Sequence, residues 1–134
     1  MLLLLLLLLT GCHPVTENTS DSQGSLLVDD ATGMRLDDHG YPAKLTGLKG
    51  LDAFVVRTDD CVHMARVLEV QRSHRQASWT NVSADMHYEM TPKDIFFSAG
   101  DLCRSFKLRV RQAHTQKDIE ANACRLADAS WQVQ

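Results

Sequence analysis

The chain has 134 residues, a formal net charge of −3 at pH 7 and 44% hydrophobic residues. A chain of this length can bury one small hydrophobic core. Its slightly acidic balance, without a concentrated basic patch, argues against nucleic-acid binding, which requires clustered lysine and arginine to neutralise phosphates.

The N-terminus is a leucine run that ends at a cysteine. Residues 2–9 are all leucine, and Thr10, Gly11 and Cys12 follow. The run is too short to span a bilayer as a helix, whereas a short apolar segment before small residues and a cysteine is typical of a bacterial lipoprotein signal. We therefore predict a signal peptide over residues 1–11 and palmitate-containing lipid on Cys12, which is acylated before cleavage and then becomes the N-terminal residue. A buried apolar helix is the alternative interpretation.

Residues 12–43 are rich in Ser, Thr, Asn, Asp and Gly and contain few apolar positions. This composition buries too little surface to offset the entropy lost on ordering, so it predicts a flexible tether between the lipid and a domain over residues 44–134. His13 follows the predicted lipid site, where an aspartate would favour retention in the inner membrane. We therefore expect an outer-membrane anchor, with the domain facing the periplasm or the cell surface.

The domain begins with a turn-rich stretch over residues 44–57 that contains a short strand. Thr58 followed by Asp59 and Asp60 then predicts a helix start, because a hydroxyl cap and carboxylates stabilise the positive end of a helix dipole. We expect this helix to end near Arg72 and to pack one face onto a sheet. The apolar positions at helical spacing are Cys61, Met64, Ala65 and Leu68.

Several strands follow the helix. Residues 77–81 predict a short strand, residues 82–85 a polar turn, and the alternation of Met86, Tyr88 and Met90 a second strand that Pro92 ends. Residues 95–97 then start another extended segment, which turns over residues 98–101.

The stretch from Leu102 to Val133 predicts a β-hairpin with a defined register. If Cys103 lies opposite Cys124, apolar residues face apolar residues on one side and charges of opposite sign meet on the other. The remaining pairs in this register are Phe106 with Ala121, Leu108 with Ile119, Lys107 with Glu120 and Arg109 with Asp118. We expect a disulfide between Cys103 and Cys124, and a loop over residues 112–115, because Ala113 and His114 lack the Asn-Gly signal of a two-residue turn.

Together these elements predict an α+β fold, with one helix packed on a small antiparallel sheet of about four strands and a C-terminal disulfide-linked hairpin. Cys61 is then left without a partner. Its place on the apolar face of the helix favours a buried, inert thiol, and an intermolecular disulfide or a reactive thiol is the alternative.

Three short motifs carry a resemblance to a known family. They are Cys103-Arg104-x-Phe106, Ala123-Cys124-Arg125 and Asp128-x-Ser130-Trp131-x-Val133. Looser matches upstream are Ala65-x-x-Leu68, Ser78-Trp79-x-Asn81 and Thr91-Pro92. Together these segments resemble the C-terminal domain of bacterial outer-membrane surface antigens of the seventeen-kilodalton lipoprotein type, over roughly residues 59–134. The sequence departs from that family at the hairpin tip, which is usually Gly-Gly, and lacks the glycine-rich segment of many members.

The resemblance implies a structural or interaction role in the cell envelope. The expected contacts are the membrane, through lipid on Cys12, and envelope proteins or peptidoglycan. A tethered inhibitor of a hydrolase such as lysozyme is the alternative. Arg104 and Arg125 match motif positions and could serve a ligand, although stacking on Trp131 is the favoured role.

We expect no enzymatic activity, no cofactor and no small-molecule substrate. The six histidines lack the spacing of zinc ligands, and the chain has neither a nucleophile elbow nor a phosphate-binding glycine loop. Cys61 and His63 are two residues apart on the expected helix and would point about 200° apart, so they would not converge on a metal ion.

Overall fold

The structure is a computed structural model that describes Cys12 and residues 27–29, 34–36 and 42–134. The expected signal peptide over residues 1–11 lies outside the described residues, as does most of the expected tether. Within the tether range, β1 (Leu27–Asp29) and β2 (Met34–Leu36) pair as a small antiparallel sheet.

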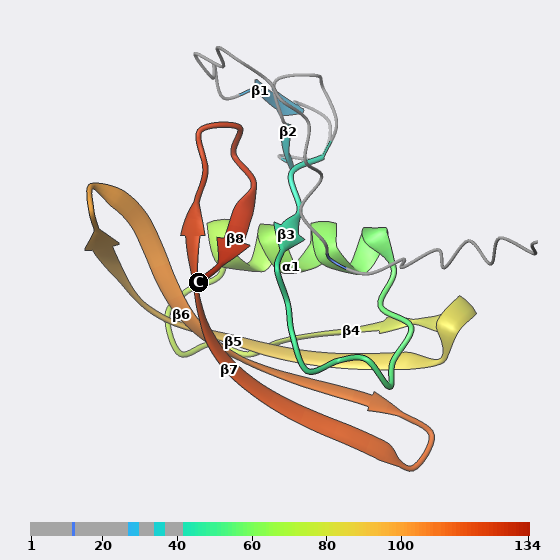
Figure 1. Cartoon of the computed structure of the whole chain (residues 1–134). Helices are drawn as coiled ribbons and strands as arrows, with labels where there is room; N and C mark the ends of the chain where they lie inside the picture. Colours follow the sequence, from blue (N-terminus) through green and yellow to red (C-terminus); the bar gives the residue numbers. More distant parts are fainter. Residues whose placement is uncertain (1–11, 13–26, 30–33, 37–41) are drawn as a thin grey trace, which may run out of the picture.

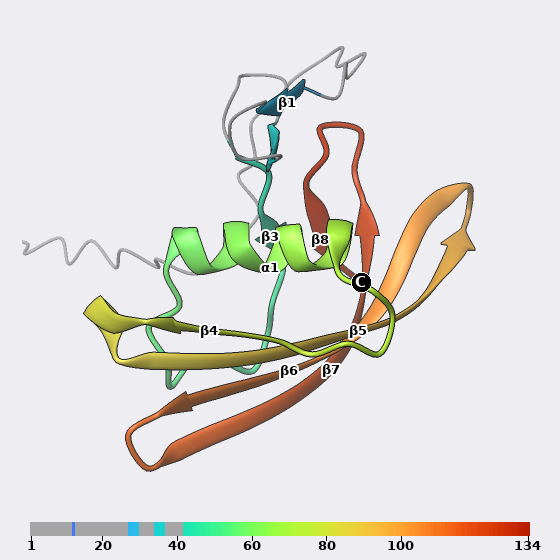
Figure 2. The same ribbon diagram turned by 180° about the vertical axis from the view of Figure 1, so that it is seen from behind.

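One curled sheet and one α-helix make up the rest of the described chain (Figure 1). In chain order the elements are β3 (Leu45–Thr46), α1 (Thr58–Val70), β4 (Ala77–Asn81), the 3-10 helix η1 (Val82–Ala84), β5 (Met86–Ser98), β6 (Asp101–Gln112), β7 (Thr115–Arg125) and β8 (Trp131–Val133). The strand order is β3-β8-β7-β6-β5-β4. The view from behind shows α1 lying across one face of the curled strands (Figure 2).

The α+β class, the α-helix and the disulfide-linked hairpin are confirmed at this coarse level, but the expected number of strands was wrong. The sheet has six strands, and it is mixed because β3 pairs parallel with β8. The two-residue β3 comes from the start of the domain and β8 from its end. A pairing between such short and distant segments leaves no local signal in the sequence.

Helix α1 buries the expected face. Cys61, Met64, Ala65 and Leu68 are all buried against the sheet. The expected hydroxyl cap at Thr58 was wrong, because the N-cap residue is Arg57, whose backbone N–H donates to the Asp60 carboxylate at 3.4 Å. The helix also ends at Val70, slightly earlier than expected.

Strand β5 continues through Pro92, which was expected to end it. The register with β6 shifts between Pro92 and Ile95, as in a β-bulge. The carbonyl of Pro92 accepts from the His74 backbone N–H at 2.7 Å on the side away from β6. The position that a backbone N–H would occupy at Pro92 also faces away from β6. β4 does not reach this position, because its pairing with β5 stops at Ala77 and Met90. The proline therefore removes no hydrogen bond from the sheet.

The hairpin of β6 and β7 has the expected register. Cys103 lies opposite Cys124, and the other four predicted pairs are also directly opposed. The expected loose tip was wrong. Gln112 pairs with Thr115, which leaves a two-residue turn with Ala113 at φ 51°. The long ladder fixes both strand ends, and it outweighs the cost of about 1 kcal/mol for an alanine in the left-handed region.

The core lies between α1 and the sheet. Its largest fully buried side chains include Trp131 from β8, Tyr88 from β5, Phe106 from β6 and Met64 from α1. The disulfide between Cys103 and Cys124, which are 21 residues apart in sequence, stabilises a domain with so small a core by on the order of 3 kcal/mol.

Candidate functional site

The expected disulfide between Cys103 and Cys124 is present. The two Cα atoms are 4.0 Å apart, which is the close spacing of a pair whose backbone groups do not hydrogen-bond to each other. The bond fastens β6 to β7 near the end of the hairpin farthest from its turn, where β8 also joins the sheet.

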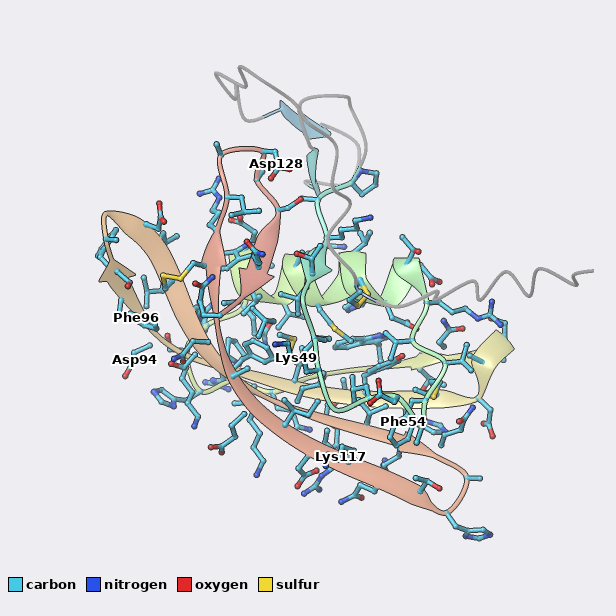
Figure 3. All side chains as sticks on the ribbon, viewed as in Figure 1. Lys49, Phe54, Asp94, Phe96, Lys117 and Asp128 are labelled. Carbon is cyan, nitrogen blue, oxygen red and sulfur yellow. A yellow bond between two sulfur atoms is a disulfide. The ribbon has the colours of Figure 1, made fainter. Side chains whose placement is uncertain are left out.

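Cys61 is buried as expected, but it is not a free thiol. The structure pairs it with Cys12 in a second disulfide, with 6.0 Å between the Cα atoms (Figure 3). Cys12 is itself buried, and its carbonyl accepts from the Gly47 N–H at 2.6 Å. A lipid thioether and a disulfide use the same sulfur atom, so one Cys12 residue can carry only one of them.

Arg104 caps the C-terminal end of α1. It is buried on β6, where its Nη1 donates to the Leu68 carbonyl at 2.9 Å and its Nε donates to the Lys93 carbonyl at 2.8 Å. Its Nη2 donates to Ser73 Oγ at 3.2 Å. One guanidinium therefore satisfies a terminal helix carbonyl and holds the loop after the helix against β5.

Arg125 and Trp131 share one carboxylate. The Arg125 Nε lies 3.0 Å from Glu69 Oε1, and the Trp131 indole N–H donates to the same oxygen at 3.0 Å. Arg125 also keeps one buried guanidinium nitrogen, Nη2, without a hydrogen-bond partner. The expected stacking on Trp131 is corrected, since the ring contacts found among the described residues involve neither arginine.

A buried carboxylate, Asp60, lies at the other end of α1, where the sequence predicted only a residue that stabilises the helix start. Asp60 Oδ2 accepts from the Tyr88 hydroxyl at 2.9 Å and from the Asn81 amide at 3.0 Å, while Oδ1 accepts from the Trp79 indole at 3.4 Å. The sequence does carry a signal for it. Asp60 is four residues before Met64 and therefore falls on the buried face of the helix.

Three rings stack beside this carboxylate. The centroids of His63 and Trp79 are 4.1 Å apart, and those of Trp79 and Tyr88 are 5.0 Å apart. Burial lowers the pKa of His63, Arg66 lowers it further, and Asp60 opposes the shift. Burial and the hydrogen bond to Asp60 raise the pKa of Tyr88 well above its usual range. The lowered pKa of His63 and the raised pKa of Tyr88 both favour the neutral side chains. Neutral, packed rings stabilise the fold, so the role of this cluster is structural.

The described residues show neither a metal site nor a membrane-spanning helix. No group of three or more His, Cys, Asp or Glu side chains among them could hold a metal ion. Within the same residues, no helix is both long and apolar enough to cross a bilayer.

The outer end of the β5–β6 hairpin is apolar and exposed. Ile95, Phe96 and Phe97 are 52%, 36% and 74% exposed, and the two-residue turn that follows has Ala99 and Gly100 at positive φ. Asp94 and Phe96 lie at this end of the sheet (Figure 3). Residues 95–97 were expected to be extended, but nothing in the sequence indicated that their side chains would be exposed.

Comparisons with known proteins gave one informative result. A family model described as 17 kDa outer membrane surface antigen matches residues 66–132. Neither the search of curated proteins nor the search of solved structures gave a match.

The fold and the buried polar contacts define a small α+β domain. One α-helix packs on its sheet, and disulfides cross-link it. The matched region runs from within α1 to β8 and contains Arg104, Arg125, Trp131 and the Cys103–Cys124 disulfide. The chain belongs to the family of 17 kDa outer membrane surface antigens.

Proposed function

We propose that the protein is an outer-membrane lipoprotein whose α+β domain has a structural or interaction role in the cell envelope. Family membership carries this proposal. The leucine run that ends at Cys12 supports the anchor, because a short apolar segment followed by small residues and a cysteine is typical of a lipoprotein signal.

The proposed role is not enzymatic. Two buried polar groups of the kind that take part in catalysis are already engaged in holding the fold together. Asp60 accepts three side-chain hydrogen bonds, and Arg104 bridges α1, β5 and the loop between α1 and β4. Groups committed in this way stabilise the domain.

Lipid on the Cys12 sulfur excludes a disulfide at the same atom. Two or three acyl chains on Cys12 bind a membrane far more firmly than one chain does. In the lipid-modified protein the sulfur of Cys12 is consumed, so Cys61 remains a buried thiol. The Cys12–Cys61 disulfide then belongs to chains that escape lipidation.

Labelled palmitate and the intact mass of the membrane-purified protein test the anchor. We expect the wild-type protein to take up label and to begin at Cys12. Cys12→Ser should abolish both labelling and membrane retention, while Cys61→Ser, the matched control, should keep both. A membrane-purified protein that begins upstream of Cys12, carries no lipid and retains the Cys12–Cys61 disulfide would refute the anchor.

A pull-down of the detergent-solubilised protein from its own envelope tests the role. We expect envelope proteins or peptidoglycan to co-purify. Recovery of a single soluble hydrolase, such as lysozyme, with its activity suppressed would contradict a structural role and indicate an inhibitor.

A further inference from the structure

The outer half of β5 is an open sheet edge. β4 pairs with β5 only over Met86 to Met90. Beyond it, the loop before β4 covers the backbone edge as far as Lys93, through the hydrogen bonds of His74 N–H to the Pro92 carbonyl and of Ser73 Oγ to the Lys93 carbonyl. The His74 ring of this loop also lies 3.1 Å from the Asp94 carboxylate. From Asp94 to Ser98, β5 has β6 on one side and no strand of the described chain on the other.

The side chains on this edge favour pairing. Native proteins protect free edges with charges, prolines or very short strands. Between Asp94 and Ser98 the edge carries only Ile95, Phe96 and Phe97, all exposed. The other long open edge of the same sheet, the first part of β7, is protected, since its exposed residues include Lys117, Asp118 and Glu120.

The backbone groups that face outward follow from the ladder. Cys103 and Cys124 form a pair without mutual backbone hydrogen bonds, so the N–H and C=O of Cys103 point toward β5. Cys103 lies opposite Phe96, and these two residues therefore exchange backbone hydrogen bonds. The backbone groups alternate along a strand, so those of Ile95 and Phe97 point outward to the open edge.

We propose that this edge, residues 94–98, is a dimer interface at which β5 pairs antiparallel with β5 of a second copy of the chain, about a twofold axis at Phe96. Ile95 then lies opposite Phe97 of the partner subunit, and the outward backbone groups of these two residues form hydrogen-bonded pairs on both sides of the axis. Phe96 meets Phe96 of the partner subunit in the non-hydrogen-bonded position, where opposed side chains lie closest.

A second copy of the chain fits this edge because the segment can pair with itself. In this register the outward backbone groups of one copy meet those of the other, and the opposed side chains are compatible. Successive residues alternate between the two faces of a sheet, and this register keeps each face continuous across the axis. It places Asp94 opposite Ser98 of the partner subunit, so no charges of like sign meet. Aromatic pairs and pairs of an aromatic with a β-branched residue are among the favourable cross-strand contacts. The interface does not depend on the lipid anchor.

The test uses the full chain purified in detergent, with the dimer fraction measured by analytical ultracentrifugation over a range of protein concentrations. We expect the wild-type protein to dimerise. Phe96→Glu and Phe96→Lys should each weaken association by about tenfold or more, because each variant opposes two like charges. Mixing the two variants should restore dimers, because opposite charges then meet at the axis.

Val82→Glu and Val82→Lys are matched controls, since Val82 is 85% exposed on η1, away from the edge. They should leave association unchanged. A second variant, Phe97→Pro, removes an outward N–H and should weaken association without disturbing the β6 ladder. Retention of the Cys103–Cys124 disulfide and of the circular dichroism spectrum confirms that each variant folds.

Three results would overturn the proposal. The first is that the wild-type protein is monomeric. The second is that the Phe96→Glu variant folds and associates as strongly as the wild type. The third is that a mixture of the two charged variants stays monomeric. Binding of a monomeric wild-type protein to lipid vesicles that Phe96→Glu abolishes would instead assign the edge to a membrane surface.

Discussion

Asp60 connects the start of the helix to two strands. Its side chain is almost fully buried and accepts from Asn81 at the end of β4 and from Tyr88 in β5. A buried carboxylate is tolerated only where hydrogen bonds replace its water, and here three side-chain donors and one backbone N–H supply them. The same residue therefore fixes the position of the helix against the sheet.

Asp60→Ala should lower the free energy of unfolding by about 3 kcal/mol, because it leaves the Tyr88 hydroxyl and the Asn81 amide buried without an acceptor. Urea denaturation measures this change. Asp59→Ala is the control, since Asp59 is exposed in the same first turn and contributes only about 0.5 kcal/mol through the helix dipole. Equal losses for the two variants would contradict the role of Asp60.

His63 should make the fold sensitive to mild acid. Burial, with the charge of Arg66 in second place, lowers its pKa in the folded protein below the ordinary value of 6.5. As the pH falls through 6.5, the unfolded chain takes up a proton before the folded protein does. The part of the stability that depends on His63 is therefore complete above that pH and decreases as the pH falls below it.

His63→Phe keeps a ring on Trp79 and removes the titration. Unfolding free energies at about pH 8 and about pH 5 should differ less in this variant than in the wild type. His114→Phe, at the exposed hairpin tip, should leave the difference unchanged. An unaltered difference in His63→Phe would show that other groups cause the acid sensitivity.

At the scale of elements, two arginines on β6 have different roles because they lie on opposite faces. Arg104 is buried and caps α1, whereas Arg109 lies on the outer face, where its Nε and Nη2 donate to Asp118 at 2.8 and 3.1 Å. The alternation of the strand predicts which of the two faces the core. It does not predict that the buried arginine meets the end of the helix.

Arg104→Met should cost about 3 kcal/mol of unfolding free energy, because the carbonyls of Leu68 and Lys93 both lose a charged donor. Arg109→Met, on the same strand, should lower the unfolding free energy far less, because an exposed ion pair contributes little to stability. Thermal or chemical denaturation of the two variants side by side makes the comparison. A smaller loss for Arg104→Met than for Arg109→Met would contradict the capping role.

At the scale of the whole molecule, Trp131 joins the two ends of the domain. Its backbone N–H donates to the Lys44 carbonyl at 3.1 Å, its carbonyl accepts from Thr46 Oγ1 at 3.4 Å and its indole N–H binds Glu69 on α1. The ring itself is buried in the core. One residue thus holds β3, β8 and the helix together.

Trp131→Ala should therefore lower the free energy of unfolding by about 3–5 kcal/mol, and the whole domain should unfold in one cooperative transition. Val82→Ala is the control for the loss of an exposed apolar side chain, since Val82 is 85% exposed on η1 and its truncation should change stability by less than about 0.5 kcal/mol. Differential scanning calorimetry on both variants checks the contrast. A small loss for Trp131→Ala would mean that the sheet holds together without β8.

The helix face, the hairpin register and the Cys103–Cys124 disulfide could be predicted from the amino-acid sequence alone. These features rest on periodicity and on pairs that are close along the chain, where a one-residue slip would reverse every side chain. Four contacts could be seen only in the folded protein. They are the pairing of β3 with β8, the cap that Arg104 forms on α1, the hydrogen bonds to Asp60 and the disulfide between Cys12 and Cys61. Each of these contacts joins segments distant in the chain. The geometry of such contacts is fixed by how the sheet curls around the helix, and no local pattern records that curl.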